Sequence, residues 1–162
     1  MGRAPNLVVG MGNPILCDDA VGVRLASSIA KSLGGRADVD VIEECSVGGL
    51  NLIDVLAGYR RAFVLDSIKT TGGRPGDWYH FTAERLRDTM NLACVHDANF
   101  ATALELGRRL GHDLPESSDV HVFAVEVSDN TTFSETMSPP LEAAFPRYSS
   151  EIRAEVETLL GP

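Results

Sequence analysis

Four segments of this 162-residue chain place acidic or imidazole side chains where a predicted strand ends or a helix begins. Asp18-Asp19 follow the first apolar run, Glu43-Glu44 follow the second, and Asp66 follows the third. His96 stands just before a predicted helix. If the three runs are parallel neighbours in one sheet, their carboxyl ends share one rim and these groups converge there. Three carboxylates and an imidazole would then form a divalent-metal site of mixed oxygen and nitrogen character.

Each group also has a plainer structural interpretation. Asp18 or Asp19 is expected to cap the first helix, because a carboxylate there accepts a free N–H and suits the helix dipole. Asp66 could cap a turn, although an unpaired charge directly after four apolar residues is costly to bury. His96 could be a surface residue beside a helix N-cap at Asp97. The sequence leaves both interpretations open.

The apolar pattern predicts the elements that must position these groups. Short β-rich or continuous apolar runs predict strands at 7–9, 39–42, 62–65, 78–81 and 121–127. Apolar residues at helical spacing predict helices at 21–33, at 50–56, over 97–110 and over 141–159. The alternation predicts one domain, residues 1–162, built as a three-layer α/β/α sandwich with a mainly parallel twisted sheet. The turn-rich stretches 69–77 and 128–139 are expected to move most.

Composition and charge exclude several classes of protein. The net charge of −9 argues against a nucleic-acid binder, which needs a basic face, and against docking on anionic lipid. It suits a protein that meets a cation or a basic segment of a partner. No apolar run approaches the roughly 18 residues that a membrane span requires, and no secretory signal is recognisable. The three cysteines are widely spaced and form no disulfide framework, which indicates a reducing cytoplasm.

Familiar nucleotide-binding and nucleophile motifs are absent from the sequence. A dinucleotide fingerprint needs a third glycine where Ile15 stands, and Asn13-Pro14 replaces the expected start of a helix. The chain has no Gly-Lys-Ser/Thr phosphate loop and no Gly-x-Ser-x-Gly nucleophile elbow. A nucleotide-binding domain is therefore an unfavoured alternative.

The other cysteines and histidines show no catalytic arrangement. Cys17 and Cys45 lie near the same predicted rim, but neither has a histidine base nearby in the chain, so covalent catalysis is not indicated. His80, His112 and His121 have no constellation of polar residues around them and are interpreted as structural.

The segment from Val9 to Gly22, which reads VGMGNPILCDDAVG, resembles the opening signature of the [NiFe]-hydrogenase maturation endopeptidases. The resemblance continues in order along most of the chain. It covers Glu44 with Gly48-Gly49-Leu50, Val64-Leu65-Asp66-Ser67, Val95-His96-Asp97, Glu126-Val127 and Thr136-Met137-Ser138-Pro139. Each fragment alone is weak, but the order and spacing together are fairly specific.

The resemblance implies a function and a set of site residues. These enzymes remove the C-terminal extension from the precursor of the hydrogenase large subunit once nickel has been inserted. The family's metal-contacting positions carry over to Asp19, Asp66 and His96. The acidic position of the second strand carries over to Glu44, where relatives often have Asp, and Glu43 is the alternative. The resemblance further implies a phosphorylase/hydrolase-like fold, a cytoplasmic monomer and catalysis that involves these four positions.

The expected mechanism leaves some alternatives open. Nickel held by the precursor is the expected metal, and zinc or cadmium would fit the same ligands nearly as well. Water would attack the scissile bond, assisted either by the metal as Lewis acid or by a carboxylate as base. Glycines 10 and 12 and Gly48-Gly49 would let a peptide approach the backbone closely. A non-proteolytic nickel-binding or chaperone protein for hydrogenase assembly is the alternative function.

Overall fold

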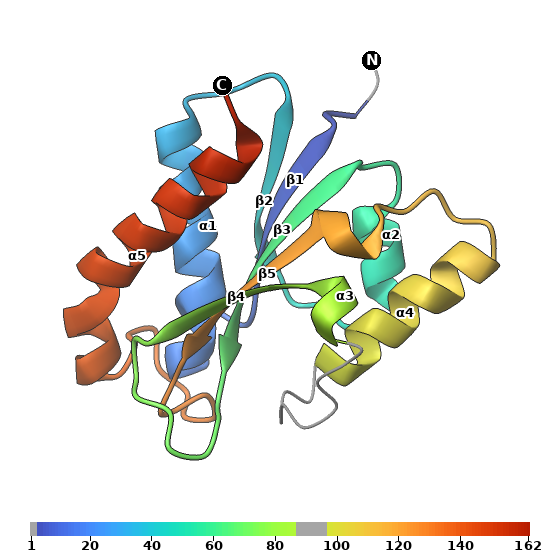
Figure 1. Ribbon diagram of the computed structural model, residues 1–162. Coiled ribbons are helices and arrows are strands. Elements are labelled where there is room, and N and C mark those ends of the chain that lie inside the picture. The colour runs from blue at the N-terminus through green and yellow to red at the C-terminus, as the bar shows by residue number, and fades with distance from the viewer. Residues whose placement is uncertain (1–2, 87–96) are drawn as a thin grey trace.

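Five strands form one sheet in the computed structural model, which describes residues 3–86 and 97–162 (Figure 1). The strands are β1 (Asn6–Met11), β2 (Val39–Cys45), β3 (Arg61–Ile68), β4 (Trp78–Thr82) and β5 (Val120–Glu126). Their order across the sheet is β2-β1-β3-β5-β4. The first four in this order are mutually parallel, and β4 runs antiparallel to β5 at one edge. The predicted mainly parallel sheet is thus confirmed.

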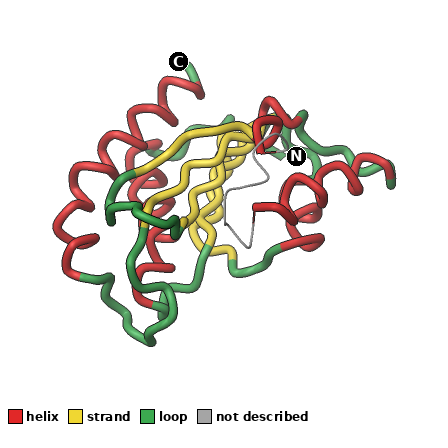
Figure 2. Tube along the Cα trace, turned by 60° about the horizontal axis from the view of Figure 1, so that its bottom comes forward, coloured by secondary structure: helices red, strands yellow, loops and turns green. Residues whose placement is uncertain are grey.

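Helices cover both faces of the sheet. One face carries α1 (Val21–Leu33) and α5 (Pro139–Leu160), and the other carries α2 (Leu52–Leu56), α3 (Ala83–Leu86) and α4 (Asp97–Arg109). Short 3-10 turns are η1 (Cys17–Ala20), η2 (Gly49–Asn51) and η3 (Ser117–Asp119). Figure 2 shows the same two groups of helices on either side of the strands. The three-layer α/β/α architecture is therefore as predicted, and α3 is an element that the apolar pattern did not predict.

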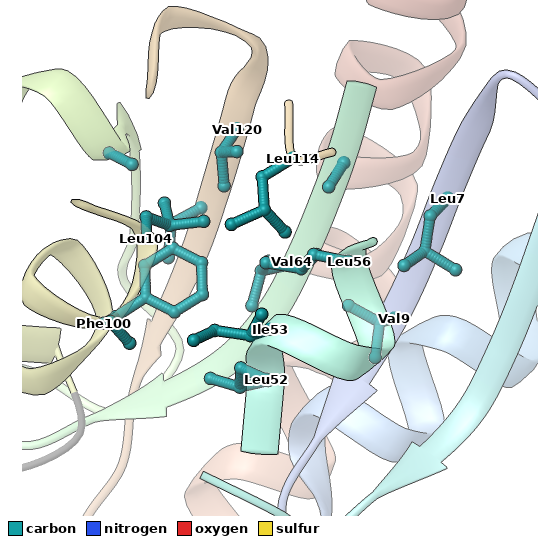
Figure 3. Packing of buried hydrophobic residues seen from close by; sticks show 14 of the residues in the cluster. Leu7, Val9, Leu52, Ile53, Leu56, Val64, Phe100, Leu104, Leu114 and Val120 are labelled. Atoms are coloured by element: carbon teal, nitrogen blue, oxygen red, sulfur yellow. The ribbon is translucent and has the colours of Figure 1, made fainter. Parts of the chain in front are cut away.

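Two hydrophobic clusters fill the spaces between the layers. Side chains of successive strand residues point to opposite faces, so Val8 packs toward α1 and α5, whereas Leu7 and Val9 pack toward α2 and α4. Figure 3 shows the cluster on the side of α2 and α4, which includes Val64 and Phe100. Because β1 is covered on both faces, all six of its residues are buried. This explains its continuous apolar sequence.

No helix within residues 3–86 and 97–162 is long and apolar enough to cross a membrane.

Two glycines allow α1 to lie unusually close to the centre of the sheet. A Cβ added to Gly10 in β1 would lie 2.5 Å from the carbonyl oxygen of Glu43 and 2.8 Å from Cβ of Ala26. A Cβ added to Gly22 in α1 would overlap the carbonyl oxygens of Met11 and Leu65. These neighbours are mostly backbone atoms, which cannot move aside as a flexible side chain can. The contact therefore sets where α1, and the turn before it, sit at the end of the sheet.

The edge strand β4 contacts β5 and α5 through a pair of histidines. Nε2 of His80 lies 3.0 Å from Nδ1 of His121, and His80 stacks on Phe123 with 4.4 Å between ring centroids. Nδ1 of His80 lies 3.7 Å from the Glu155 carboxylate of α5. The two histidines were predicted to be structural without partners, but cross-strand register brings them together. Burial lowers the pKa of both imidazoles, and the mutual repulsion of the two rings lowers the pKa of His121 further.

We expect Gly22→Ala to destabilise the protein by about 1–3 kcal/mol or more, because the added methyl group must displace backbone. Ser28→Ala, in the same helix and half-buried, adds no atoms and serves as the control. The measurement is the free energy of unfolding in urea. Equal stability of the two variants would contradict the close approach of α1 to the sheet.

The histidine pair predicts a pH dependence of stability. Because the folded pKa values lie below the ordinary value of 6.5, the unfolded chain binds protons more readily than the folded chain. Stability should therefore fall as the pH drops below about 6.5. The negative charges of Glu155 and Asp119 raise the pKa of the histidines and so weaken this effect, whereas the positive charges of Arg61 and Arg85 lower it and strengthen the effect.

The measurement is thermal unfolding between about pH 7.5 and about pH 5.5. The double variant His80→Gln/His121→Gln should lose less stability over this interval than the wild type. His112→Gln, at an exposed position, should keep the wild-type dependence. A double variant with the wild-type dependence would show that the pair is not responsible.

Candidate functional site

A pocket lies at the carboxyl ends of β1, β2 and β3, and it contains two of the predicted site residues. Asp19 and Asp66 both line it. The rest of its lining comes from the turn after β1 and from the end of β2 with the loop that follows: Met11, Gly12, Asn13, Cys45, Ser46, Val47 and Gly48. Within the described part of the chain, this lining holds two carboxylates and no lysine or arginine. The pocket therefore suits a cation.

Asp19 is held by two hydrogen bonds from different segments. Its Oδ2 accepts the backbone N–H of Asn13 at 2.8 Å, and its Oδ1 accepts the hydroxyl of Ser67 at 3.2 Å. The carboxylate is half-buried at the rim. Asn13 is placed by the turn at Gly12, whose φ of 127° is unfavourable for other residues and where a Cβ would overlap the carbonyl oxygen of Asp19.

Asp66 stands near the end of β3, where the strand leaves the hydrophobic interior. Val64 and Leu65 before it are buried, whereas Asp66 itself is half-buried. Its Oδ1 accepts the backbone N–H of Ser67 at 2.7 Å. Parallel pairing of β1 with β3 brings Gly10 opposite Leu65, so the turn after β1 and the end of β3 meet at the same rim. The predicted convergence of these two strand ends is observed.

The other predicted site residues, His96, Glu44 and Glu43, are not found in the described lining of this pocket. His96 lies outside them, so its role as a ligand stays a prediction. Glu44 and Glu43 are exposed residues of β2 and do not line the pocket. Val9 pairs with Ile42 and Met11 pairs with Cys45, so the register shifts between them and Gly10 lies opposite both glutamates. Their roles also stay predictions.

No group of three or more His, Cys, Asp or Glu side chains that could hold a metal ion is present among residues 3–86 and 97–162. Asp19 and Asp66 would supply two ligands, and a third would come from His96, as predicted, or from a metal-bearing partner. Metal binding at this pocket therefore stays a prediction.

Asp18 has a different role from Asp19, although the two are adjacent. Its side chain is fully buried and accepts the backbone N–H groups of Ser128, Asp129 and Ser138 at 3.0, 2.9 and 2.6 Å. Its Oδ2 also accepts the hydroxyl of Ser138 at 2.9 Å. Burial by itself would raise the pKa of Asp18, but these N–H and O–H donors outweigh it and lower the pKa.

The helix-capping interpretation is therefore wrong for both aspartates. Neither the turn η1 nor α1 has a side-chain hydrogen bond at its N-cap. Asp18 binds the loop that leads to α5, and Asp19 binds the turn after β1 and the end of β3. The loop 128–139, expected to move most, is tied to this buried carboxylate.

A second buried carboxylate, Glu126, holds the other turn-rich stretch. It is almost completely buried at the end of β5 and accepts the backbone N–H of Thr70 at 3.1 Å, together with the hydroxyl of Thr70. The hydroxyl of Tyr79 donates to it at 3.2 Å. Gly73 packs directly against this carboxylate. Each of the two long loops is thus attached to the body of the fold by one buried acid.

Two cysteines lie within the described residues. Both Cys17 and Cys45 are buried. Burial raises the pKa of the Cys17 thiol, and the negative charges of Asp18 and Asp129 raise it further. Cys45 lines the pocket, and its thiol lies 4.0 Å from the carbonyl oxygen of Val47. The expectation that covalent catalysis is not used stays a prediction, because Cys94 and His96 lie outside the described residues.

The proposed close approach of a peptide to the glycines is corrected in part. The space beside Gly10 is filled by α1 and the backbone of β2, and the space beside Gly12 is filled by the backbone of Asp19. Both glycines serve the packing of the chain itself. Gly48, by contrast, is exposed and lines the pocket, and a Cβ added to Gly49 would meet no atom within 4 Å.

Two polar groups that hold Asp19 were not predicted as site residues. Ser67 belongs to a segment that matches the family, and Asn13 belongs to the turn after the first strand. The signal was their position directly after the strands, since a residue there shares the rim with its acidic neighbour. The sequence alone does not show that these two groups point toward Asp19, because that depends on where the turn η1 lies in the fold.

Comparison with solved structures identifies the fold. Hydrogenase maturating endopeptidase HybD from E. coli is 20% identical, covers 93% of this chain and 91% of its own, and superposes with a TM-score of 0.72. The [NiFe] hydrogenase maturation protease HybD from Thermococcus kodakarensis is 18% identical over 94% and 99% of the two chains, with a TM-score of 0.71. Hydrogenase 2 maturation peptidase from Thaumarchaeota archaeon SCGC_AB-539-E09 is 23% identical over 96% and 97%, with a TM-score of 0.63.

No protein-family model and no curated protein matches the sequence. The expected resemblance to hydrogenase maturation endopeptidases is confirmed in the fold, which these structures share with the present chain over nearly its full length.

We expect Asp18→Ala to destabilise the protein by at least about 2 kcal/mol, because buried donors of the 128–138 loop lose their acceptor. Asp54→Ala, at an exposed position of α2, is the control and should stay within about 0.5 kcal/mol of the wild type. Urea unfolding measures both. Wild-type stability of Asp18→Ala would show that the carboxylate does not anchor the loop.

Proposed function

We propose that this protein is an endopeptidase that removes the C-terminal extension of a [NiFe]-hydrogenase large-subunit precursor after nickel insertion. The observation that carries the proposal is the convergence of Asp19 and Asp66 in one pocket, in a chain with the fold of hydrogenase maturation endopeptidases. Recognition of the nickel by these carboxylates would couple cleavage to completion of the metal site.

The chemistry of the pocket supports recognition of a metal that the substrate carries. Carboxylates attract a divalent cation, and an imidazole from His96 would add the borderline ligand that nickel favours. Zinc or cadmium would satisfy the same groups, so either is a suitable surrogate in an experiment. In this proposal the nickel belongs to the precursor, and the protein needs no resident metal of its own.

Binding of the nickel would also position the peptide to be cut. A metal fixed between Asp19 and Asp66 would hold the bound chain across the rim, near Gly48, which also lines the pocket. A water molecule would then attack the scissile carbonyl, with the metal as Lewis acid or a carboxylate as general base. Glu44, exposed on β2 outside the pocket lining, is better placed for contact with the precursor than for activation of this water.

The partner proposed for this site is the large-subunit precursor itself. The net charge of −9 suits a partner that presents a cation or a basic segment. We propose that the protein acts as a monomer in the cytoplasm on this precursor.

A non-proteolytic nickel-binding or chaperone protein for hydrogenase assembly is the second candidate. It is favoured by the presence of Asp19 and Asp66 in one pocket, because two carboxylates could hold nickel as well as recognise it. It differs from the first in one measurable respect, since a chaperone would leave the mass of the precursor unchanged.

The test is the mass of the nickel-loaded precursor after incubation with the protein. We expect loss of the C-terminal extension with the wild type and at least about a 100-fold slower loss with Asp19→Ala, Asp66→Ala or His96→Ala, because each removes a contact to the metal. Asp54→Ala and His112→Ala, both at exposed positions, are the matched controls and should retain activity.

Two results would contradict the proposal. An unchanged precursor mass with the wild type would favour the chaperone. Full processing by the three folded site variants would remove Asp19, Asp66 and His96 from the metal-recognition role.

A further inference from the structure

Ser67 donates hydrogen bonds to both carboxylates of the pocket. Its backbone N–H binds Oδ1 of Asp66 at 2.7 Å, and its hydroxyl binds Oδ1 of Asp19 at 3.2 Å. We infer that Ser67 is a positioning residue, which holds Asp19 and Asp66 in a fixed mutual geometry for capture of a divalent cation. The inference rests on the proposed function, because it concerns the same metal-recognition site.

The two carboxylates reach the pocket from opposite sides of the sheet. Along β3, Val64 belongs to the cluster under α2 and α4, and Leu65 belongs to the cluster under α1 and α5. By the alternation of a strand, Asp66 follows the side of Val64, and both line the same small cavity with Phe100. Ser67 follows the side of Leu65, which is the side of α1.

The position of Ser67 on the side of α1 brings its hydroxyl to Asp19, which lies in the turn that leads into α1. The N–H of the same residue stays in reach of Asp66, its predecessor in the chain. Ser67 thus links, by two hydrogen bonds, a carboxylate from each side of the sheet.

The hydroxyl also completes the restraint of Asp19. Oδ2 of this carboxylate is held by the N–H of Asn13 at 2.8 Å, and Oδ1 is held by Ser67. With both oxygens bound, rotation of the carboxylate is restricted before any metal arrives. Two carboxylates that share a pocket repel each other. Neutral N–H and O–H donors stabilise both charges and leave the space between the carboxylates free for a cation. A lysine or arginine in the same place would compete with the metal.

Loss of the hydroxyl should therefore act on metal affinity more than on folding. Groups that orient metal ligands typically change metal affinity or activity by about 10- to 100-fold when they are removed. The backbone bond from Ser67 to Asp66 survives any side-chain replacement, so only the restraint on Asp19 is lost. Ser67→Thr keeps a hydroxyl on a strand that accepts β-branched residues, and it serves as the conservative variant.

The experiment is calorimetric titration of the full-length protein with Ni²⁺, together with processing kinetics on the precursor. We expect about 10- to 100-fold weaker Ni²⁺ binding by Ser67→Ala and restoration by Ser67→Thr. Ser150→Ala, at an exposed serine of α5, is the matched control and should bind as the wild type does. Urea unfolding of each variant separates a loss of affinity from a loss of fold.

The outcomes distinguish this inference from the proposed function. Ni²⁺ affinity of Ser67→Ala within about twofold of the wild type, failure of Ser67→Thr to restore it, or no Ni²⁺ binding by the wild type would overturn the inference. If Ni²⁺ affinity depends on the hydroxyl but the wild type leaves the precursor uncut, the inference stands and the endopeptidase proposal fails.

Discussion

The close approach of α1 to β1 and β3 is the constraint on which the candidate site depends. Gly22 of α1 touches the carbonyl oxygens of Met11 and Leu65, and Gly10 leaves room for the same helix. These contacts set the position of the turn η1 at the carboxyl end of the sheet. They therefore decide where Asp18 and Asp19 emerge, one toward the interior and the other toward the rim.

The acidic residues at this end of the sheet divide into two kinds by their burial and by their donors. Asp18 and Glu126 are buried, and backbone N–H and hydroxyl groups of two long loops bind their oxygens. Asp19 and Asp66 are half-buried and border a pocket. A buried carboxylate must be fully hydrogen-bonded to be tolerated, whereas one at a rim can retain affinity for a cation. The first kind stabilises the loops around the site, and the second kind is available for chemistry.

Within residues 3–86 and 97–162, Asp19 and Asp66 are the two predicted ligands that meet in the pocket, and the proposed function assigns the remaining ligands to His96 and to the partner. Two carboxylates held by neutral donors bind a lone metal less firmly than a closed four-ligand site would. In the proposed function, the metal reaches the pocket already coordinated by the partner. This dependence would make nickel in the precursor the signal for cleavage, which is a physical basis for acting only after the metal has been inserted.

The sequence by itself determined the elements and the candidate rim. Continuous apolar runs predicted the buried strands, helical spacing predicted α1, α4 and α5, and acidic residues after the runs marked the carboxyl ends of β1 and β3. Only the tertiary structure decided which of two adjacent aspartates is buried, since that depends on how η1 packs against the loop before α5. It also decided that Ser67 reaches Asp19, and that His80 and His121 meet, because contacts between distant segments depend on strand order and register, which local sequence patterns do not encode.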